Sequence, residues 1–504
     1  MVHAIVCVML CLGVISPLCV RAYDVVPTRL SLSYEELRLG GQETMGLLGG
    51  SYAVRPGGPI DVGLAVFGAA RGERGGFFTG GATAGLHHML TGRLHFDADV
   101  FAGAGGGGSA PQGGGFMLRT HAGLSLDFDT VSVGAGYAWV DFPNGNITSD
   151  HLVVSASHPF GLLLGGGWRD DSDIDIAEAV PGTHQKPQVQ SFDAILVVAS
   201  PVGGTRNTAG EAQEGDMAMI GVAWERVLSP GSFLELSVVG SMGGAGDGYA
   251  QGVCDLGARV VLSPSLDLVL GGGLGLAGGG KVDTGGGLIG DVFVKLEQSL
   301  GRGYHLGGGV GAVGAADGDF LATRLHLDFG YDFETPVPTG GWRVQGSQVY
   351  RPGHLRLRLA HQTEQPADGA LRKGGTPDRT INLAGLKGDI MITRSLLLSG
   401  QVLSAYDGGA GGYAAGLAGL GGEWAAGRRS PWLFGVETLI GAAGGGGIVV
   451  DGGLIAQATA GLGYRTGGVT DAWLRLGRSG SLRGSFERTV VSVELGFRFS
   501  TLMR

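Results

Sequence analysis

The 504-residue sequence is short of the residues that mark several protein classes. It has four cysteines, and Cys7, Cys11 and Cys19 all fall within the first 22 residues, so only Cys254 lies beyond them. A single thiol excludes an internal disulfide framework. Proline is limited to 18 residues, which argues against a disordered linker protein rich in proline and glycine.

Charge and long apolar runs are scarce as well. Charged residues make up 16% of the chain, and the formal net charge is −10. We see no basic cluster, so we expect no nucleic-acid partner. Beyond residue 22, no run of about 18 apolar residues is free of charge and of glycine runs, which excludes a membrane protein built from apolar helices.

Glycine, in contrast, is abundant, with 102 of the 504 residues. Glycine at this level opposes helices, and the absence of a Gly-X-Y period excludes collagen. The glycines lie inside alternating apolar runs, which is typical of sheets with bends and close backbone approaches. The composition therefore predicts an all-β chain.

Residues 1–22 read as a secretory signal. Ala4 to Val20 is mostly apolar, and Val20-Arg21-Ala22 forms a small-residue cleavage site before Tyr23. An uncleaved anchor is the alternative interpretation. Export, a mean hydropathy of +0.21 and the lack of an apolar helix together point to a transmembrane β-barrel.

The last strand has one apolar and one polar face. Val491, Val493, Leu495, Phe497 and Phe499 alternate with Ser492, Glu494, Gly496 and Arg498, so we expect the first set to face lipid and the second to face a lumen. This strand resembles the closing strand of bacterial outer-membrane β-barrel proteins, which ends in Phe and serves as their assembly signal. Here Ser500–Arg504 follow that Phe. The resemblance implies the outer membrane as location, with outer-membrane lipid and the barrel-assembly machinery as partners.

The chain contains an internal repeat. Similar strands end at Phe160, Phe333 and Phe499, which recur at intervals of 173 and 166 residues. Glycine-rich hairpin tips at 103–115, 278–287 and 441–453 recur in step with these strands, and Gly166–Arg169 recurs at Gly340–Arg343. Three markers with one period predict three related units. We place barrel repeat 1 at 23–166, a connector and repeat 2 at 167–339, and a connector and repeat 3 at 340–504.

Each unit reads as eight strands. In the first we expect them near 28–39, 43–56, 60–72, 76–90, 92–103, 115–128, 131–142 and 149–160. Short turns alternate with longer loops, which is the pattern of membrane barrels whose short turns face the periplasm.

Two architectures fit these units. They could merge into one transmembrane antiparallel β-barrel of about 24 strands, or form three tandem eight-stranded barrels. Strands with little side-chain volume on the inward face, such as Leu266–Leu276 and Tyr413–Ala426, would leave voids in a narrow barrel, so we expect the single wide barrel. The matching function is a passive channel or export conduit for polar solutes or polymer. The alternatives are structural or anchoring tandem barrels without a pore and, with less support, a membrane lipid hydrolase.

The polar faces supply the candidate site residues. We expect Arg119, His121, Asp291, Lys295, Glu297, Arg324, His326, Asp328, Asp332, Glu494 and Arg498 to face the lumen. For the four that share one strand face, Arg324, His326, Asp328 and Asp332, we favour a structural charge network over an ion path.

We expect no catalytic, cofactor or metal site. Ser149, Asp150 and His151 cannot form a catalytic triad among themselves, because adjacent strand residues point to opposite faces. No His, Cys or carboxylate cluster has metal-ligand spacing. The sequence therefore predicts a protein that is not an enzyme. The acidic run Asp171–Glu178 reads as a solvated connector, with a contact for a periplasmic partner or for divalent cations as the alternative.

Overall fold

The computed structural model describes residues 23–40, 43–128, 130–168, 174–175, 184–339, 349–427, 430–466 and 468–503. The expected signal at 1–22 and the acidic run apart from Ile174 and Asp175 lie outside these ranges. Within them the chain folds into 24 long strands and the two-residue strand β9 (Ile174–Asp175). No helix of the described residues is long and apolar enough to cross a bilayer. The prediction of an all-β chain is confirmed.

The first eight strands form a closed ring, which we call barrel 1. They are β1 (Tyr23–Arg38), β2 (Thr44–Gly57), β3 (Ile60–Arg71), β4 (Phe78–Thr91), β5 (Leu94–Gly106), β6 (Phe116–Asp127), β7 (Ser132–Asp141) and β8 (Thr148–Gly166). Each strand pairs antiparallel with the next, and β1 also pairs with β8, for example at Ser33 and Ser155. The boundaries lie close to those expected from the sequence.

The next eight strands close in the same way and form barrel 2. They are β10 (His184–Pro201), β11 (Met217–Ser229), β12 (Ser232–Gly244), β13 (Ala250–Ser263), β14 (Leu266–Gly278), β15 (Leu288–Gly301), β16 (Tyr304–Ala315) and β17 (Leu321–Thr339). The pairing of β10 with β17 completes the ring.

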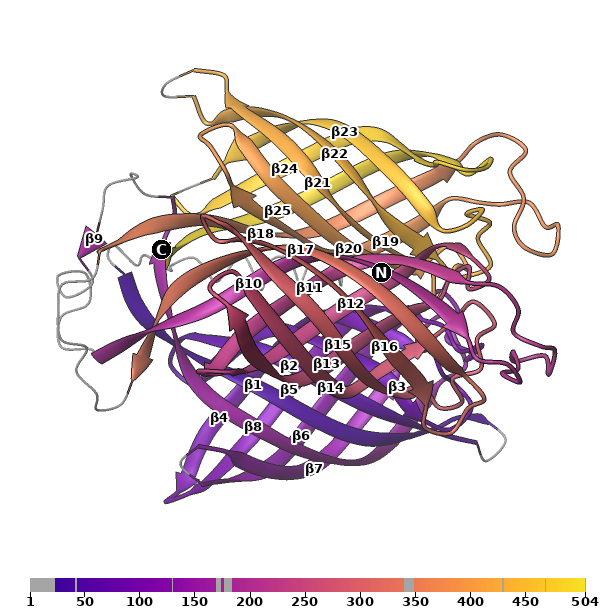
Figure 1. Cartoon of the computed structure of the whole chain (residues 1–504), viewed down its shortest axis with the longest axis horizontal. Coiled ribbons are helices and arrows are strands. Elements are labelled where there is room, and N and C mark those ends of the chain that lie inside the picture. The colour runs from indigo at the N-terminus through magenta and orange to yellow at the C-terminus, as the bar shows by residue number, and fades with distance from the viewer. Residues whose placement is uncertain are drawn as a thin grey trace.

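The last eight strands form barrel 3. They are β18 (Val349–Pro366), β19 (Ile381–Met391), β20 (Leu396–Asp407), β21 (Ala414–Ala425), β22 (Trp432–Gly444), β23 (Leu454–Arg465), β24 (Thr470–Ser481) and β25 (Glu487–Met503). The pairing of β18 with β25 completes this ring. In Figure 1 the indigo and purple barrel 1, the magenta to red barrel 2 and the orange to yellow barrel 3 lie beside one another.

The prediction of one merged barrel of about 24 strands is wrong. In a merged barrel β25 would meet β1, but β25 pairs along its length with β18, and β1 pairs with β8. Among the described residues, only a two-residue pairing of Phe499 and Ser500 with Gly166 and Gly165 joins the strands of barrel 3 to those of barrel 1. The strand pairing matches the alternative of three eight-stranded barrels.

The void argument failed because inward glycines accommodate large side chains from neighbouring strands. A β-carbon on Gly271 of β14 would lie 2.4 Å from the Phe293 ring. A β-carbon on Gly463 would lie 2.6 Å from the Trp473 ring. An eight-stranded barrel is just wide enough to be filled by side chains, and here small and large inward residues alternate between strands to fill it.

The three barrels contact one another in a cyclic order at their long-loop ends. The loop 279–287 of barrel 2 meets loop 72–77 of barrel 1, where Gly75 N–H donates to Gly285 O at 2.9 Å. Loop 408–413 of barrel 3 meets barrel 1 in turn, because Gly412 N–H donates to Gly105 O at 3.2 Å.

Barrels 2 and 3 complete the cycle. The loop 445–453 of barrel 3 packs against loop 245–249 of barrel 2, and Lys373 Nζ lies 3.5 Å from an Asp247 carboxylate oxygen. At this contact a β-carbon on Gly444 would lie 2.8 Å from the Gly248 backbone. Every glycine-rich tip marked in the sequence therefore packs against another barrel, at distances that leave no room for a side chain.

The opposite, short-turn end of the molecule has a second shared contact. There β8 and β25 pair at Gly166 and Phe499, and β17 contacts both of these strands. The three strands that close the barrels therefore meet one another.

We expect the substitution Gly75→Val to loosen the contact between barrels 1 and 2. Its β-carbon would lie 2.4 Å from Thr284 Oγ1 and 2.6 Å from Gly285 O, and such overpacking costs about 1–3 kcal/mol. Hydrogen exchange should show faster exchange of the amides around Gly75 and Gly285, with the strand amides of β3 and β15 unchanged. Gly290→Val is the matched control, because nothing lies within 4 Å of its β-carbon. Equal effects of both substitutions would contradict the proposed contact.

Candidate functional site in the charged barrel interiors

The candidate lumen residues mostly point into the barrels. The buried ones are Arg119, Asp291, Lys295, Glu297, Arg324, Asp328, Glu494 and Arg498. His121 and His326 are half-buried, while Asp332 is exposed at the short-turn end of barrel 2. On the closing strand β25, Val491 and Val493 are exposed, and Leu495, Phe497 and Phe499 are half-buried on the outer face. The sequence analysis treated the candidate lumen residues as one group, but in the structure they lie in the interiors of three separate barrels.

Barrel 3 has a compact ion-pair network at its centre. Arg358 donates hydrogen bonds to Glu494 at 2.6 Å, to Asp389 at 2.5 Å and to Glu437 at 2.6 Å. Lys387 Nζ lies 2.8 Å from Glu494 Oε1 and 3.0 Å from Glu437 Oε2. Both cationic side chains are fully inaccessible to solvent. The network fills the middle of the barrel with paired charges.

Two tryptophans flank this network toward the short-turn end of barrel 3. The Arg356 guanidinium lies 5.4 Å from the Trp473 ring centroid and 5.6 Å from the Trp168 ring centroid, within the range of cation–π attraction. Trp168 follows β8 of barrel 1, and its Nε1 donates to Leu355 O at 3.0 Å. A residue next to the first connector therefore packs at the short-turn end of another barrel.

Barrel 2 has an acidic interior around one lysine. Lys295 Nζ lies 3.9 Å from Glu235, 3.5 Å from Glu297 and 3.6 Å from Asp328. Arg259 pairs with Glu225, Asp267 and Glu297. His305 Nε2 lies 2.9 Å from Asp193 Oδ1, and Arg324 pairs with Asp291.

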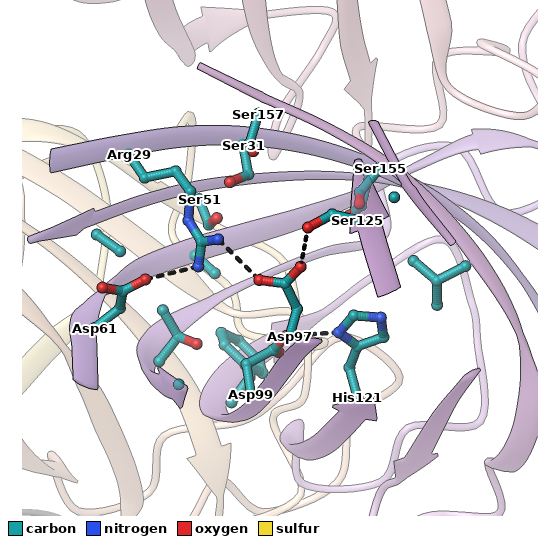
Figure 2. A pocket seen from close by; sticks show the side chains of 18 of the residues that line it. Arg29, Ser31, Ser51, Asp61, Asp97, Asp99, His121, Ser125, Ser155 and Ser157 are labelled. Atoms are coloured by element: carbon teal, nitrogen blue, oxygen red, sulfur yellow. Dashed lines mark hydrogen bonds and ion pairs between the residues drawn. The ribbon is translucent and has the colours of Figure 1, made fainter. Parts of the chain in front are cut away.

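Barrel 1 encloses a polar cavity of about 110 Å³. Figure 2 shows Arg29 between Asp61 and Asp97, with serine hydroxyls on the surrounding strands. Arg29 lies 2.7 Å from Asp61 and 3.0 Å from Asp97, and Asp99 lies 2.8 Å from His121. A polar cavity of this size can hold several water molecules.

Ser149 and His151 do come together, but with a partner that is remote in sequence. Ser149 Oγ lies 3.1 Å from His151 Nδ1, and His151 Nε2 lies 3.2 Å from Glu35 Oε2. Asp150 points to the other face and accepts a hydrogen bond from Tyr137. Ser149 is 3% exposed, so a substrate carbonyl cannot reach its hydroxyl while the barrel is closed. This serine, histidine and glutamate form a buried polar chain rather than an accessible triad.

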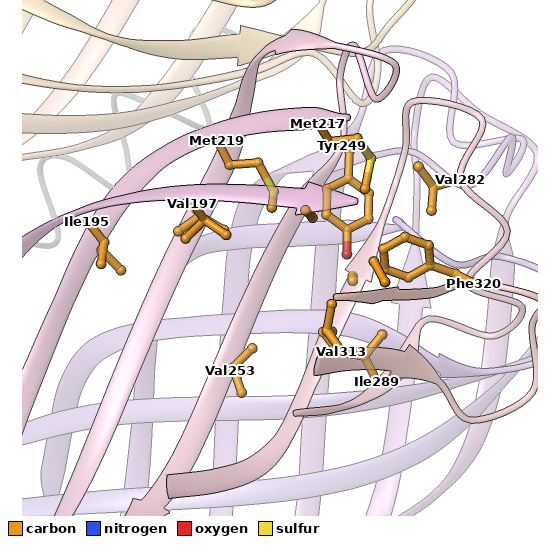
Figure 3. Close-up of a cluster of buried hydrophobic side chains, with 14 of the residues drawn as sticks. Ile195, Val197, Met217, Met219, Tyr249, Val253, Val282, Ile289, Val313 and Phe320 are labelled. Carbon is orange, nitrogen blue, oxygen red and sulfur yellow. The ribbon is translucent and has the colours of Figure 1, made fainter. Parts of the chain in front are cut away.

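Each barrel has an apolar plug at its long-loop end. In barrel 2 it includes Tyr249, Phe320 and Met217, which are buried together (Figure 3). In barrel 1 the plug includes Phe67 and Phe101, whose ring centroids are 5.1 Å apart. Barrel 3 has an equivalent cluster that includes Tyr413, Ile448 and Leu403. The described interiors therefore combine a charged middle with an apolar cap.

An arginine ties the outer loops of barrel 1 together above this plug. Arg74 donates to both carboxylate oxygens of Glu43, at 2.6 and 2.7 Å, and to Ser109 O at 2.7 Å. The hydrogen bonds from Arg74 hold the pKa of the Glu43 carboxyl below its usual range. Hydrogen bonds from Arg74 therefore link the outer loops of barrel 1 to one another.

The sequence prediction missed several charged residues at the centre of barrel 3. Arg356 and Arg358 alternate with Leu355, Leu357 and Leu359 in β18, which is the signature of a strand with one polar face. This alternation could have placed both arginines in the lumen. The sequence around Glu35 in β1 gives no comparable sign of its contact with His151, because the two residues come together only when β1 pairs with β8 and the ring closes.

No family model and no curated protein matches the chain. Among solved structures, it is similar to a ferric enterobactin receptor of Pseudomonas aeruginosa, with a TM-score of 0.26, 11% identity, and coverage of 94% of this chain and 81% of the receptor. It is similar to the siderophore receptor PirA of Pseudomonas aeruginosa, with a TM-score of 0.25, 9% identity, and coverage of 94% and 80%.

A third similar structure is OpdQ of Pseudomonas aeruginosa, with a TM-score of 0.21, 10% identity, and coverage of 95% of this chain and 98% of OpdQ. At these TM-scores none of the three supports an argument about fold or function. The assignments below rest on the geometry of the chain itself.

We expect Glu494→Gln to destabilise barrel 3. The substitution removes the carboxylate charge shared by Arg358, Lys387 and Arg475 and leaves a buried positive charge uncompensated in the network, which costs about 3–5 kcal/mol. The free energy of unfolding in urea, followed by tryptophan fluorescence in detergent micelles, measures this loss. The adjacent Val493→Leu on the outer face is the control and should change it by less than about 0.5 kcal/mol. A Glu494→Gln variant as stable as the wild type would show that the network contributes little.

Proposed function

We propose that this chain is an integral β-barrel protein of a bacterial outer membrane, and that its three barrels act as a closed anchoring or scaffolding unit without an open pore. Residues 1–22 would direct its export. The observation that carries the proposal is the combination of an apolar outer face with an apolar plug at the long-loop end of all three barrels.

The outer face of each barrel exposes large apolar side chains along its strands. Examples are Leu152 (75% exposed) in barrel 1, Leu274 (64%) in barrel 2 and Leu476 (58%) in barrel 3. They are part of a larger set that includes Leu124, Val133, Val154, Val238, Val292, Leu325, Phe329, Val402, Phe434, Val436 and Leu474. Apolar surface of this extent marks an interaction or membrane surface, and its position around closed antiparallel rings supports lipid as the partner.

The interiors argue against a wide conduit. A passive channel for polymers or large solutes needs a lumen wider than an eight-stranded ring provides. Here the middle of each barrel holds paired charges and the long-loop end holds an apolar plug. Structural or anchoring barrels therefore fit the geometry better than the channel expected from the sequence.

The three units 23–166, 167–339 and 340–504 would be copies of one ancestral barrel. The same hydrogen bond recurs at the start of the fourth strand of each barrel. Ala69 N–H donates to Phe77 O at 2.9 Å, and Ser241 N–H donates to Tyr249 O at 2.8 Å. In barrel 3, Ala405 N–H donates to Tyr413 O at 2.9 Å. These matching hydrogen bonds support the repeat independently of the glycine-rich segments.

The partners follow from this location. The chain would contact outer-membrane lipid through its outer face and would need the barrel-assembly machinery for insertion, with the closing strand β25 as one signal for it. We propose no enzymatic activity, because the Ser149 and His151 pair is enclosed. A periplasmic partner at the connectors stays a prediction.

A narrow passage through barrel 1 is the second candidate function. The cavity of about 110 Å³ supports it, since its lining includes Ser51, Ser125, Ser155 and Ser157 as well as charged groups. Such a path would carry water or small ions only, and only if the plug at Phe67 and Phe101 opened.

Planar-bilayer recording of the purified full-length protein tests both functions. The anchoring proposal predicts no large single-channel steps, because no wide lumen exists. Small steps in the wild type that disappear in Ser155→Phe, which fills the cavity, would support the passage through barrel 1 instead. Phe434→Ala on the outer face of β22 is the control and should not change the recording. Large steps in the wild type would contradict the closed interiors.

A further inference from the structure

We propose that barrel 1 binds a divalent transition-metal ion of the Zn²⁺ type at its short-turn end, through His87, His95 and Asp127. One potential ligand atom from each residue lies within 4.8 Å of those of the other two. The residues come from three successive strands, β4, β5 and β6, and are far from regular ligand spacing in the sequence. The proposal needs only the closed barrel 1 and is independent of the membrane function.

A carboxylate fixes the orientation of His87. Its Nδ1 lies 2.5 Å from Asp97 Oδ1, and Arg29 donates to the same carboxylate oxygen at 3.0 Å. Ser125 donates to the second oxygen of Asp97. Nδ1 of His87 also lies 2.9 Å from Arg29 Nη1, so both contacts engage Nδ1 and leave Nε2 as the nitrogen available to a metal. A carboxylate behind a histidine is the arrangement that orients metal-ligating histidines in proteins.

His95 directs one nitrogen at the third proposed ligand. Its side chain is about nine-tenths buried, and Nδ1 has no hydrogen-bond partner among the described residues, so Nε2 is the nitrogen that faces Asp127. His95 Nε2 lies 2.9 Å from Asp127 Oδ2, a separation close to the roughly 3.3 Å between neighbouring ligands of a tetrahedral zinc ion.

The two histidine rings lie directly against each other. They are stacked, with centroids 4.4 Å apart and planes 8° apart, which brings the imidazoles of β4 and β5 together at this end of the barrel. The Asp127 side chain is 36% exposed, which gives an ion access from the short-turn end. Two nitrogens and one carboxylate leave a fourth position for water.

A similar cluster in barrel 2 does not qualify. Glu297, His305 and Asp328 also lie within ligand distance of one another. However, Lys295 Nζ lies 3.5 Å from Glu297 and 3.6 Å from Asp328, so an ammonium group already neutralises these carboxylates. Asp193 pairs with Nε2 of His305. Among the described residues no lysine contacts the barrel 1 cluster, which is therefore the better site.

Titration of the purified full-length protein in detergent with Zn²⁺ tests the site. Isothermal titration calorimetry should give one tight site per chain, and Co²⁺ in place of Zn²⁺ should give visible absorption bands of a site with nitrogen and oxygen ligands. His95→Gln and Asp127→Asn should each weaken Zn²⁺ affinity at least about tenfold. Asp97→Asn should weaken it about 10–100-fold without removing a ligand. His88→Ala is the matched control, because His88 neighbours His87 in β4 but is exposed on the other face.

The outcomes separate clearly when folding is checked by the heat-dependent gel mobility of each variant. Folded His95→Gln and Asp127→Asn variants with unchanged affinity would overturn the proposal. A loss of affinity in His88→Ala equal to that in His95→Gln would also overturn it, by showing nonspecific surface binding. Absence of a tight site in the wild type would do the same.

Discussion

Eight antiparallel strands close into a ring that is only as wide as the side chains pointing into it. In this chain most of that width is filled by side chains, and barrel 1 keeps a polar cavity of about 110 Å³. Arg358, Glu494 and Lys387 fill the middle of barrel 3 with matched charges, while Lys295 is surrounded by carboxylates in barrel 2. Because an unpaired buried charge is strongly unfavourable, these groups form ion-pair networks in the interiors of barrels 2 and 3.

The same closure leaves the outer surface to hold the molecule together. Each barrel contacts one neighbour through one loop and the other neighbour through a second, different loop. The contacts are therefore head to tail and form a closed cycle of three barrels. Glycines such as Gly75 and Gly444 allow the backbones to touch, and a side chain there would hold the barrels apart. The abundance of glycine thus serves both the filling of the interiors and the packing of the barrels on one another.

Much of the strand pattern could be predicted from the sequence, because alternation along strands such as β15 and β25 is a local property. The period of the repeat was also readable from Phe160, Phe333 and Phe499. The closure of each ring could not be read from the sequence, because the strand that pairs with β25 is determined by contacts between segments far apart in the chain. The inward glycine of β14 suggested a void only because the position of Phe293 across the strand pair was unknown.

The site residues show the same limit. Lys295 and Glu494 could be assigned to a polar face from their own strands. Their partners could not, since the contacts of Lys295 with Glu235 and of Glu494 with Arg358 cross the barrel. The cluster of His87, His95 and Asp127 was invisible in the sequence for the same reason.

The central claim is that each block of eight strands closes on itself, and a disulfide test addresses it most directly. In a chain with Cys254 replaced by serine, the paired positions Ser33 and Ser155 and the paired positions Gln362 and Ser492 are changed to cysteine, one pair at a time. Directly paired strand residues have Cα atoms about 4.5–5.5 Å apart, within reach of a disulfide. Closed separate barrels predict that each pair forms its disulfide on oxidation of the folded protein, while the pair Ser33 and Ser492 does not. A merged barrel would place β1 beside β25 and β8 beside β10, so failure of the first two pairs to form disulfides in folded protein would contradict the account.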